Sequence, residues 1–183
     1  MNRKSSGEPT NYSFIILIAV IVVVGGIILL QGSKDNPGMT EQGSTSAASS
    51  TVAPDFSLPK IGGGIGSIKD YRGKVMVLDF WATWCGPCKA EIPDFIALQK
   101  MYGDKGLQIV GLALDEQAKV ESFVREYGIN YPILIGTDAV SQTYGGIEGI
   151  PTTFIIDREG KIITSFVGFR EKRIFEEEIV KLL

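Results

Sequence analysis

The sequence contains no histidine and only two cysteines among its 183 residues. Histidine is the commonest general base and metal ligand, so any acid–base chemistry must use carboxylates, lysines, tyrosines or the thiols. A structural zinc site needs four cysteine or histidine ligands, which this chain cannot supply. Runs of lysine and arginine are also absent and the net charge is −3, which argues against a nucleic-acid-binding protein.

Seventeen consecutive apolar residues, 14–30, follow a polar N-terminus. As a helix this run would be roughly 25 Å long, near the lower limit for crossing a bilayer. A cleaved signal peptide is the alternative, but the run is longer than a usual signal core and no small-x-small cleavage site follows it. No cysteine directly follows either, which excludes a lipoprotein anchor. We therefore predict a retained transmembrane anchor at 13–31.

The anchor divides the chain into three further parts. Arg3, Lys4 and the terminal amine outweigh Glu8, which predicts that residues 1–12 are cytoplasmic. Residues 32–52 are rich in serine, glycine, threonine and alanine, a composition typical of a flexible linker. Residues 53–183 remain, and this length is sufficient for one domain with its own core.

Strand-like and helix-like segments alternate along the domain. Residues 54–74 are turn-rich and predict a hairpin, because the GGGIG cluster lacks the strand and helix of a phosphate-binding loop. The expected strands lie at 75–81, 107–115 and 131–136, and at two segments flanking a turn at 157–160. The expected helices lie at 85–102, 116–128 and 170–183, the first kinked or broken at Pro93. This order predicts an α/β sandwich around a mixed sheet.

Both cysteines lie in the stretch WATWCGPCK, as Cys85 and Cys88. Covalent haem attachment would need histidine where Lys89 stands, and a structural disulfide over so short a loop would stabilise little. A redox dithiol remains. Cys85 lies where a strand gives way to a helix, so backbone N–H groups and the helix dipole would stabilise its thiolate as the nucleophile. Cys88 lies one turn further and would resolve a mixed disulfide, while Pro87 suits the first helical turn.

The segment VLDFWATWCGPCK closely resembles the active-site segment of thioredoxins. The longer FWATWCGPCKAEIP resembles the membrane-anchored TlpA/ResA type of thiol–disulfide oxidoreductase. A second segment, GIEGIPTTFIID, resembles the landmark of that fold in which the proline, here Pro151, is cis and faces the dithiol. The resemblance covers residues 53–183. It implies a thioredoxin-like fold, a mixed central sheet flanked by helices, with an N-terminal hairpin and a central insertion around 107–135.

The resemblance also implies two acidic residues at the site. Asp79 matches the buried aspartate of thioredoxins, which accepts the proton of the resolving thiol, and Glu91 matches the glutamate of the TlpA/ResA type. The alternatives are a strand-end Asp79 that faces solvent and a Glu91 that is a solvated charge early in a helix. Because the chain has both acids, the identity of the base for Cys88 stays open.

Five residues around the dithiol are expected to contact substrate. Trp84 adjoins Cys85 and would line the surface around the sulfur. A cis bond before Pro151 would leave the Ile150 backbone free to pair with an extended substrate segment. The expected substrate-binding residues are Trp84, Gly86, Pro87, Ile150 and Pro151.

Together these features predict a single-pass protein of the bacterial cytoplasmic membrane with its catalytic domain on the extracytoplasmic side. The Gly-Pro dipeptide is that of thioredoxin, whose potential of about −270 mV is reducing. We expect a reductant of protein disulfides, for example in cytochrome c maturation, that needs no cofactor beyond its dithiol. The resemblance implies a membrane electron donor of the thiol–disulfide type.

Two other functions fit parts of the sequence. A peroxiredoxin would need proline seven residues and threonine or serine three residues before its cysteine, where Leu78 and Ala82 stand. A non-catalytic binding or assembly module on a thioredoxin scaffold would not need the intact cysteine pair.

Overall fold

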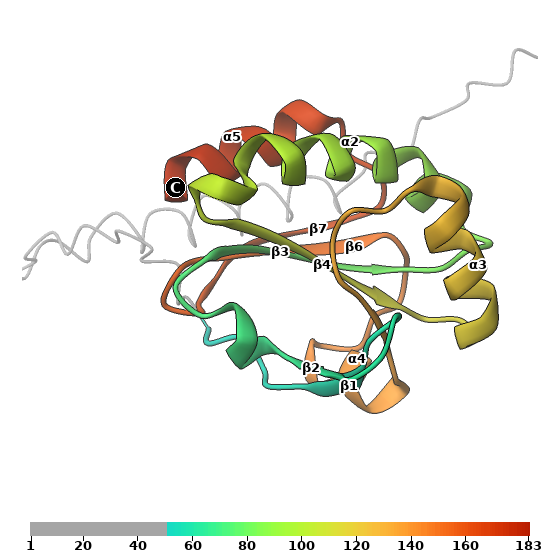
Figure 1. Cartoon of the computed structure of the whole chain (residues 1–183). Coiled ribbons are helices and arrows are strands. Elements are labelled where there is room, and N and C mark those ends of the chain that lie inside the picture. Colours follow the sequence, from blue (N-terminus) through green and yellow to red (C-terminus); the bar gives the residue numbers. More distant parts are fainter. Residues whose placement is uncertain (1–50) are drawn as a thin grey trace, which may run out of the picture. The chain divides into compact units, whose positions relative to one another are not determined.

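Five strands form the central sheet of the computed structural model, which describes residues 51–183 (Figure 1). In sheet order the strands are β5 (Ile133–Ile135), β4 (Leu107–Ala113), β3 (Val75–Trp81), β6 (Thr152–Ile156) and β7 (Ile162–Val167). β3 and β5 run parallel to β4, whereas β6 runs antiparallel to both β3 and β7, so the sheet is mixed, as predicted. The predicted anchor, at 13–31, lies outside the described residues. Within 51–183, no helix has the length and apolar character needed to cross a membrane.

The central strand β3 is buried along its whole length. Its sequence VMVLDFW is an almost continuous apolar run, which suits a strand covered on both faces. Side chains alternate between the two faces of a strand. Val77 and Trp81 belong to the core on one side of the sheet, while Leu78 and Phe80 belong to the core on the other. Asp79 therefore faces the same side as Val77 and Trp81.

Helices α2 (Gly86–Tyr102) and α5 (Lys172–Leu182) cover one face of the sheet, and α3 (Gln117–Tyr127) lies beside them (Figure 1). α2 contributes Ile92, Phe95 and Leu98 to the core on this side. α2 continues through Pro93 without a break, so a break there is not observed. The proline is exposed, and within a helix its missing N–H removes a single backbone bond. A 3-10 turn, η2 (Gly103–Lys105), links α2 to β4.

The opposite face is covered by the predicted N-terminal hairpin, β1 (Ser57–Pro59) and β2 (Ile65–Ser67), and by the 3-10 turn η1 (Ile68–Tyr71). Gly66 allows the hairpin to approach the sheet closely, because a Cβ there would lie 2.8 Å from Leu134 Cδ2. A short helix, α4 (Asp138–Thr143), also packs on this side. The sequence did not predict α4, although Thr137 caps it by accepting a bond from the Val140 N–H.

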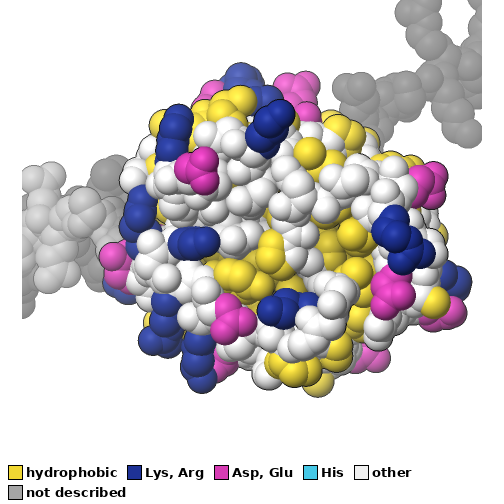
Figure 2. Space-filling view, in the orientation of Figure 1, with side chains coloured by type: hydrophobic (Ala, Val, Ile, Leu, Met, Phe, Trp, Pro, Cys, Tyr) yellow, Lys and Arg dark blue, Asp and Glu magenta, His cyan; other side chains and the backbone are white. Residues whose placement is uncertain are grey.

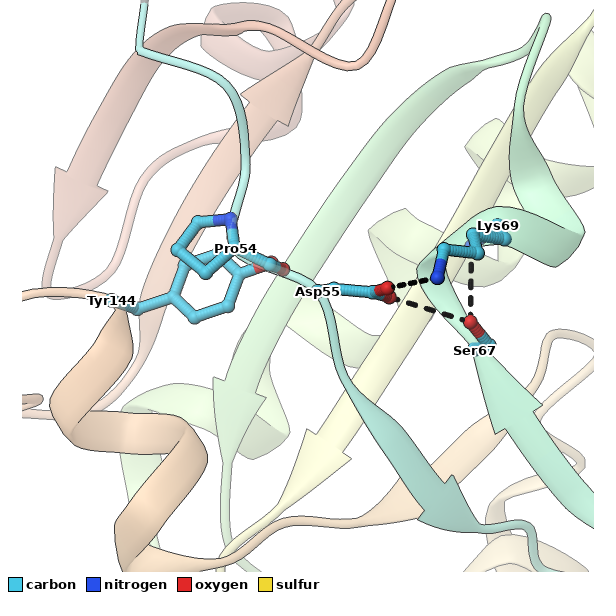
Figure 3. A network of polar contacts seen from close by, with 5 residues as sticks. All are labelled: Pro54, Asp55, Ser67, Lys69 and Tyr144. Atoms are coloured by element: carbon cyan, nitrogen blue, oxygen red, sulfur yellow. Dashed lines mark hydrogen bonds and ion pairs between the residues drawn. The ribbon is translucent and has the colours of Figure 1, made fainter.

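Polar contacts fasten the start of the described chain to this face (Figure 3). The Tyr144 hydroxyl donates a hydrogen bond to the Pro54 carbonyl oxygen at 2.8 Å. Asp55 forms an ion pair with Lys69 and accepts a bond from the Ser67 hydroxyl. These contacts hold the segment before the hairpin at two neighbouring residues, Pro54 and Asp55.

Charged side chains of both signs are interspersed over the face shown in Figure 2. They surround a central apolar area, and neither sign forms a continuous patch there. This face offers no broad basic surface of the kind that attracts nucleic acid.

Candidate redox site

Cys85 caps the N-terminus of α2, at the point where the loop after β3 enters the helix. Its backbone is extended, and its sulfur accepts a hydrogen bond from the Cys88 N–H at 3.2 Å. The two cysteines form a disulfide with an S–S distance of 2.00 Å. The predicted position of Cys85 at a helix start is confirmed, and a thiolate there would be stabilised by the N–H groups of the first turn.

Both cysteines are buried, Cys88 more completely than Cys85. Cys85 is 5% exposed and Cys88 is 1% exposed. Around them, Trp84 is 68% exposed, and Gly86 and Pro87 are exposed as well. An incoming disulfide can therefore approach over this rim to Cys85, whereas Cys88 is covered.

A second loop, directly before the start of β6, meets the dithiol. The Ile150–Pro151 peptide bond is cis, as predicted. The Ile150 carbonyl oxygen lies 3.6 Å from Cys85 Sγ, and the Pro151 carbonyl accepts a bond from the Gly168 N–H at 2.7 Å. Within residues 51–183 the Ile150 N–H makes no hydrogen bond. The residue whose carbonyl adjoins the reactive sulfur thus also has a backbone N–H without a partner in the described part of the chain.

Asp79 lies beneath the dithiol helix and is 3% exposed, so the alternative in which it faces solvent is wrong. Its register partner across β6 is Thr153, whose hydroxyl donates a hydrogen bond to Asp79 Oδ1 at 3.2 Å. Burial, and next the charge of Glu91, raise the pKa of the Asp79 carboxyl well above its usual range, while the Thr153 bond opposes this shift. Asp79 is therefore a buried acid that holds its proton strongly.

Glu91 is 1% exposed, so the alternative of a solvated helix charge is also wrong. It lies three residues after Cys88 on the α2 face that packs against the sheet, which explains its burial. Its Oε1 accepts a bond from the Arg170 N–H at 2.6 Å, whereas its Oε2 is buried without a protein partner. Burial raises the pKa of Glu91 to about 7, although the Arg170 N–H bond and charge act in the opposite direction.

Three residues that complete the surroundings of the acids did not emerge from the sequence. Tyr131 is buried in the same core as Cys88, and burial together with the charges of Asp79 and Glu91 raises the pKa of its phenol well above its usual range. Arg170 contacts Glu91 through its backbone N–H, a group that nearly every residue type carries, so the sequence does not indicate this contact. Only Thr153 could have been found, because the pairing of strands 75–81 and 152–157 places it opposite Asp79.

A link on the other side of the dithiol loop was also missed. The Thr83 hydroxyl donates a short hydrogen bond to Asp115 Oδ2, which joins the loop before Cys85 to the end of β4. The Leu114 N–H adds a bond to the Trp81 carbonyl oxygen at 2.8 Å. Among residues 51–183, no group of three or more cysteine, aspartate or glutamate side chains is placed to hold a metal ion.

Several known proteins are similar to this chain. A model of the AhpC/TSA family matches residues 50–165. The thiol–disulfide oxidoreductase ResA of Bacillus thuringiensis subsp. konkukian is 33% identical over 170 residues, which cover 92% of this chain and 94% of that protein. The thioredoxin-like protein YneN of Bacillus subtilis is 34% identical over 169 residues, which cover 90% of this chain and 94% of that protein.

A solved structure shares the fold. A thiol:disulfide interchange protein of the thioredoxin family from Chlorobium tepidum superposes with a TM-score of 0.69 and is 35% identical. The superposition covers 74% of this chain and 97% of that protein. The mixed five-stranded sheet with its N-terminal hairpin is thus a thioredoxin-like fold.

Proposed function

Because the chain belongs to the AhpC/TSA family and is a thiol–disulfide oxidoreductase of the ResA type, we propose that its Cys85–Cys88 pair reduces protein disulfides. The observation that carries this proposal is that two backbone groups lie close to Cys85 Sγ at the start of α2. Cys85 Sγ lies at the start of α2, receives the Cys88 N–H, and adjoins the Ile150 carbonyl. This arrangement supports a nucleophilic thiolate beside a backbone that can hold a peptide.

In the proposed reaction, the Cys85 thiolate attacks one sulfur of a substrate disulfide, and the other substrate sulfur leaves as a thiolate. The Cys88 thiol then loses its proton, attacks Cys85 Sγ and releases the second substrate thiolate. Two electrons pass to the substrate, and Cys85 and Cys88 end as the disulfide seen in the structure. The lower exposure of Cys88 supports this order, because an external disulfide meets Cys85 first.

Glu91 is the better candidate for the base that takes the proton from Cys88. A general base works best when its pKa lies near the working pH, and burial raises the pKa of Glu91 to about 7. The free Oε2 of Glu91 leaves one oxygen available, since Oε1 accepts the Arg170 N–H. Burial raises the pKa of Asp79 as well, and the charge of Glu91 raises it further, so Asp79 gives up its proton less readily once Glu91 is ionised.

The substrate would lie across the exposed rim. A backbone carbonyl oxygen of an extended substrate segment could accept a hydrogen bond from the Ile150 N–H, as in strand addition. Trp84, Gly86 and Pro87 would contact the substrate residues around its cysteine. Pro151 would shape the loop that presents Ile150.

The proposed compartment rests on the N-terminal segments, and the proposed direction rests on the dipeptide between the two cysteines. We propose that residues 1–12 are cytoplasmic, that 13–31 anchor the chain in the bacterial cytoplasmic membrane, and that 32–52 tether domain 53–183 on the extracytoplasmic side. The match to ResA supports a shared N-terminal extension, because its 92% coverage reaches well before residue 51. The Gly-Pro dipeptide supports a reducing pair, with apocytochrome c as one substrate and a membrane thiol–disulfide donor as the source of electrons.

A redox titration of the Cys85–Cys88 pair, combined with insulin reduction by the full chain, tests the proposal. We expect a potential of about −270 mV and disulfide reduction that disappears in Cys85→Ser. A potential of about −120 mV would indicate an oxidase instead.

If Cys85→Ser supports the protein's cellular role as well as wild type, a non-catalytic binding module is the correct function. Trapping mixed disulfides with Cys88→Ala would then identify the substrates, since resolution of the intermediate is blocked.

A further inference from the structure

A hollow of about 400 Å³ opens next to the loop that carries Ile150 and Pro151, on the sheet face opposite α2. We call it the β7 hollow. It lies between the segment that follows α4 and the edge strand β7. The residues that line it are Tyr144 through Gly149, Thr152, Phe154, Ser165 and Val167.

Two paired strands form the floor of the β7 hollow. Phe154 pairs with Ser165, and Thr152 with Val167, across the antiparallel strands β6 and β7, so these four side chains share one face. Tyr144 forms the inner wall, packed against Phe154 with ring centroids 5.2 Å apart. Its hydroxyl is held by the Pro54 carbonyl, as Figure 3 shows.

Two features of the lining indicate what the hollow would take. The 62% exposed side chain of Val167 provides an apolar surface that is open to solvent, and the largely buried rings of Tyr144 and Phe154 add apolar lining beneath it. Glu148 is exposed and forms no ion pair within residues 51–183, and the lining contains no lysine or arginine. An apolar side chain next to a cationic one would satisfy both features.

The β7 hollow adjoins the loop that reaches the redox site. Gly149 lines the hollow, and the next residue, Ile150, places its carbonyl oxygen 3.6 Å from Cys85 Sγ. A Cβ at Gly149 would already contact Val167 Cγ1 at 3.6 Å, so the loop closes one end of the hollow against β7. An extended chain advances roughly 3.3 Å per residue, so substrate residues close to the reactive cysteine can reach the hollow.

We propose that the β7 hollow is a specificity subsite for the polypeptide whose disulfide is reduced. It accepts a large apolar side chain near the substrate cysteine, and Glu148 pairs with a lysine or arginine beside that side chain. This inference rests on the proposed disulfide reduction and adds to it the class of substrate sequence. The chemistry is unchanged, since each peptide disulfide gains two electrons and becomes two thiols while Cys85 and Cys88 become the disulfide.

The test uses disulfide-linked dimers of short peptides as substrates for the reduced full-length chain. The peptides carry Leu-Lys, Leu-Glu or Gly-Lys two residues before the cysteine, or two residues after it, and kcat/KM is measured for each. Wild type is expected to favour Leu-Lys over Leu-Glu by about threefold in one of the two placements, the size of an exposed ion pair. Glu148→Lys is expected to reverse this ratio.

Two further variants separate the charge from the hollow itself. Ser165→Trp fills the hollow from β7, and we expect it to abolish the preference for Leu-Lys over Gly-Lys. Glu126→Lys makes the same charge change on the exposed side of α3 and is expected to keep the wild-type ratios. Because each result is a ratio between peptides, a general loss of activity does not imitate it.

Neutral dipyridyl disulfide serves as the reference substrate for wild type. If wild type reduces it but treats all the peptides alike in both placements, the subsite is overturned while the proposed function stands. If wild type fails to reduce dipyridyl disulfide, the proposed function itself fails. A ratio that Glu126→Lys changes as much as Glu148→Lys also overturns the subsite, because the preference would then reflect net charge.

Discussion

Replacing Glu91 by glutamine should change the way stability depends on pH. In the unfolded chain the carboxyl ionises with a pKa near its usual value of 4.5, whereas in the folded protein burial raises that pKa to about 7. The folded state therefore keeps a proton that the unfolded state loses as the pH rises. Below the unfolded pKa both states are protonated and Glu91 carries no penalty. As the pH rises towards the folded pKa, stability is lost.

The difference between the two pKa values sets the size of this loss. A rise from 4.5 to about 7 corresponds to about 3 kcal/mol of unfolding free energy once the pH exceeds the folded pKa. Glutamine has no proton to lose and retains an oxygen for the Arg170 N–H. Its NH2 group would occupy the place of the unpaired Oε2. The cost of burying that group without a partner is the same at every pH. Only the pH-dependent part reports on the charge.

Urea unfolding of the oxidised protein at about pH 4 and about pH 8 measures this effect. The unfolding free energy of Glu91→Gln relative to wild type is expected to be about 3 kcal/mol higher at pH 8 than at pH 4. Glu126→Gln, at an exposed position of α3, provides the matched control and should show no such change. If the relative stability of Glu91→Gln is the same at both pH values, the buried carboxyl does not titrate as argued.

Three further substitutions test packing and hydrogen bonds elsewhere. Gly111→Ala should destabilise the fold by about 1 to 3 kcal/mol in urea, because its Cβ would lie 2.6 Å from Ile133 Cδ1 and 2.8 Å from Trp81 Nε1; an unchanged midpoint would contradict the close approach. Tyr144→Phe should lower the free energy of unfolding by about 1 kcal/mol, because the hydrogen bond to the Pro54 carbonyl is removed. An equal loss in the control Tyr127→Phe would show that this bond is not responsible. Thr153→Val should raise the pKa of Asp79 in a carboxyl NMR titration, since the bond that lowers it is gone; a lower pKa would refute that assignment.

The sequence predicts the central strands and the dithiol well because their signals are local. The run VMVLDFW is apolar enough to require cover on both faces, and β3 has the predicted bounds, Val75–Trp81. Directly after this run, the residues CGPCK suit the first turn of a helix. The sequence alone therefore predicts a helix start at Cys85, where α2 begins. α3 ends at Tyr127, and Gly128, the last residue of the predicted helical segment 116–128, caps it in the left-handed conformation.

What the sequence could not predict depends on contacts between distant segments. α4 is only six residues long, too short for a helical apolar pattern to distinguish it from a loop. The hydrogen bond that the buried Glu91 carboxylate accepts comes from the Arg170 N–H, which lies 79 residues away along the chain. The β7 hollow likewise forms between the loop after α4 and an edge strand, so none of its parts indicates a pocket by itself.

The two buried acids differ in a way that kinetics can distinguish. In the structure, the charge of Glu91 raises the pKa of Asp79, so Asp79 loses its proton less readily once Glu91 is ionised. If Glu91 is the base for Cys88, the rate at which a mixed disulfide at Cys85 is resolved should rise with pH around a midpoint of about 7. Asp79→Asn should keep that midpoint, whereas Glu91→Gln should lose it and slow resolution by about a hundredfold at neutral pH. Single-turnover resolution, followed by quenched flow from pH 5 to 9, gives both profiles. A midpoint that survives in Glu91→Gln but disappears in Asp79→Asn would assign the proton to Asp79, as in thioredoxins.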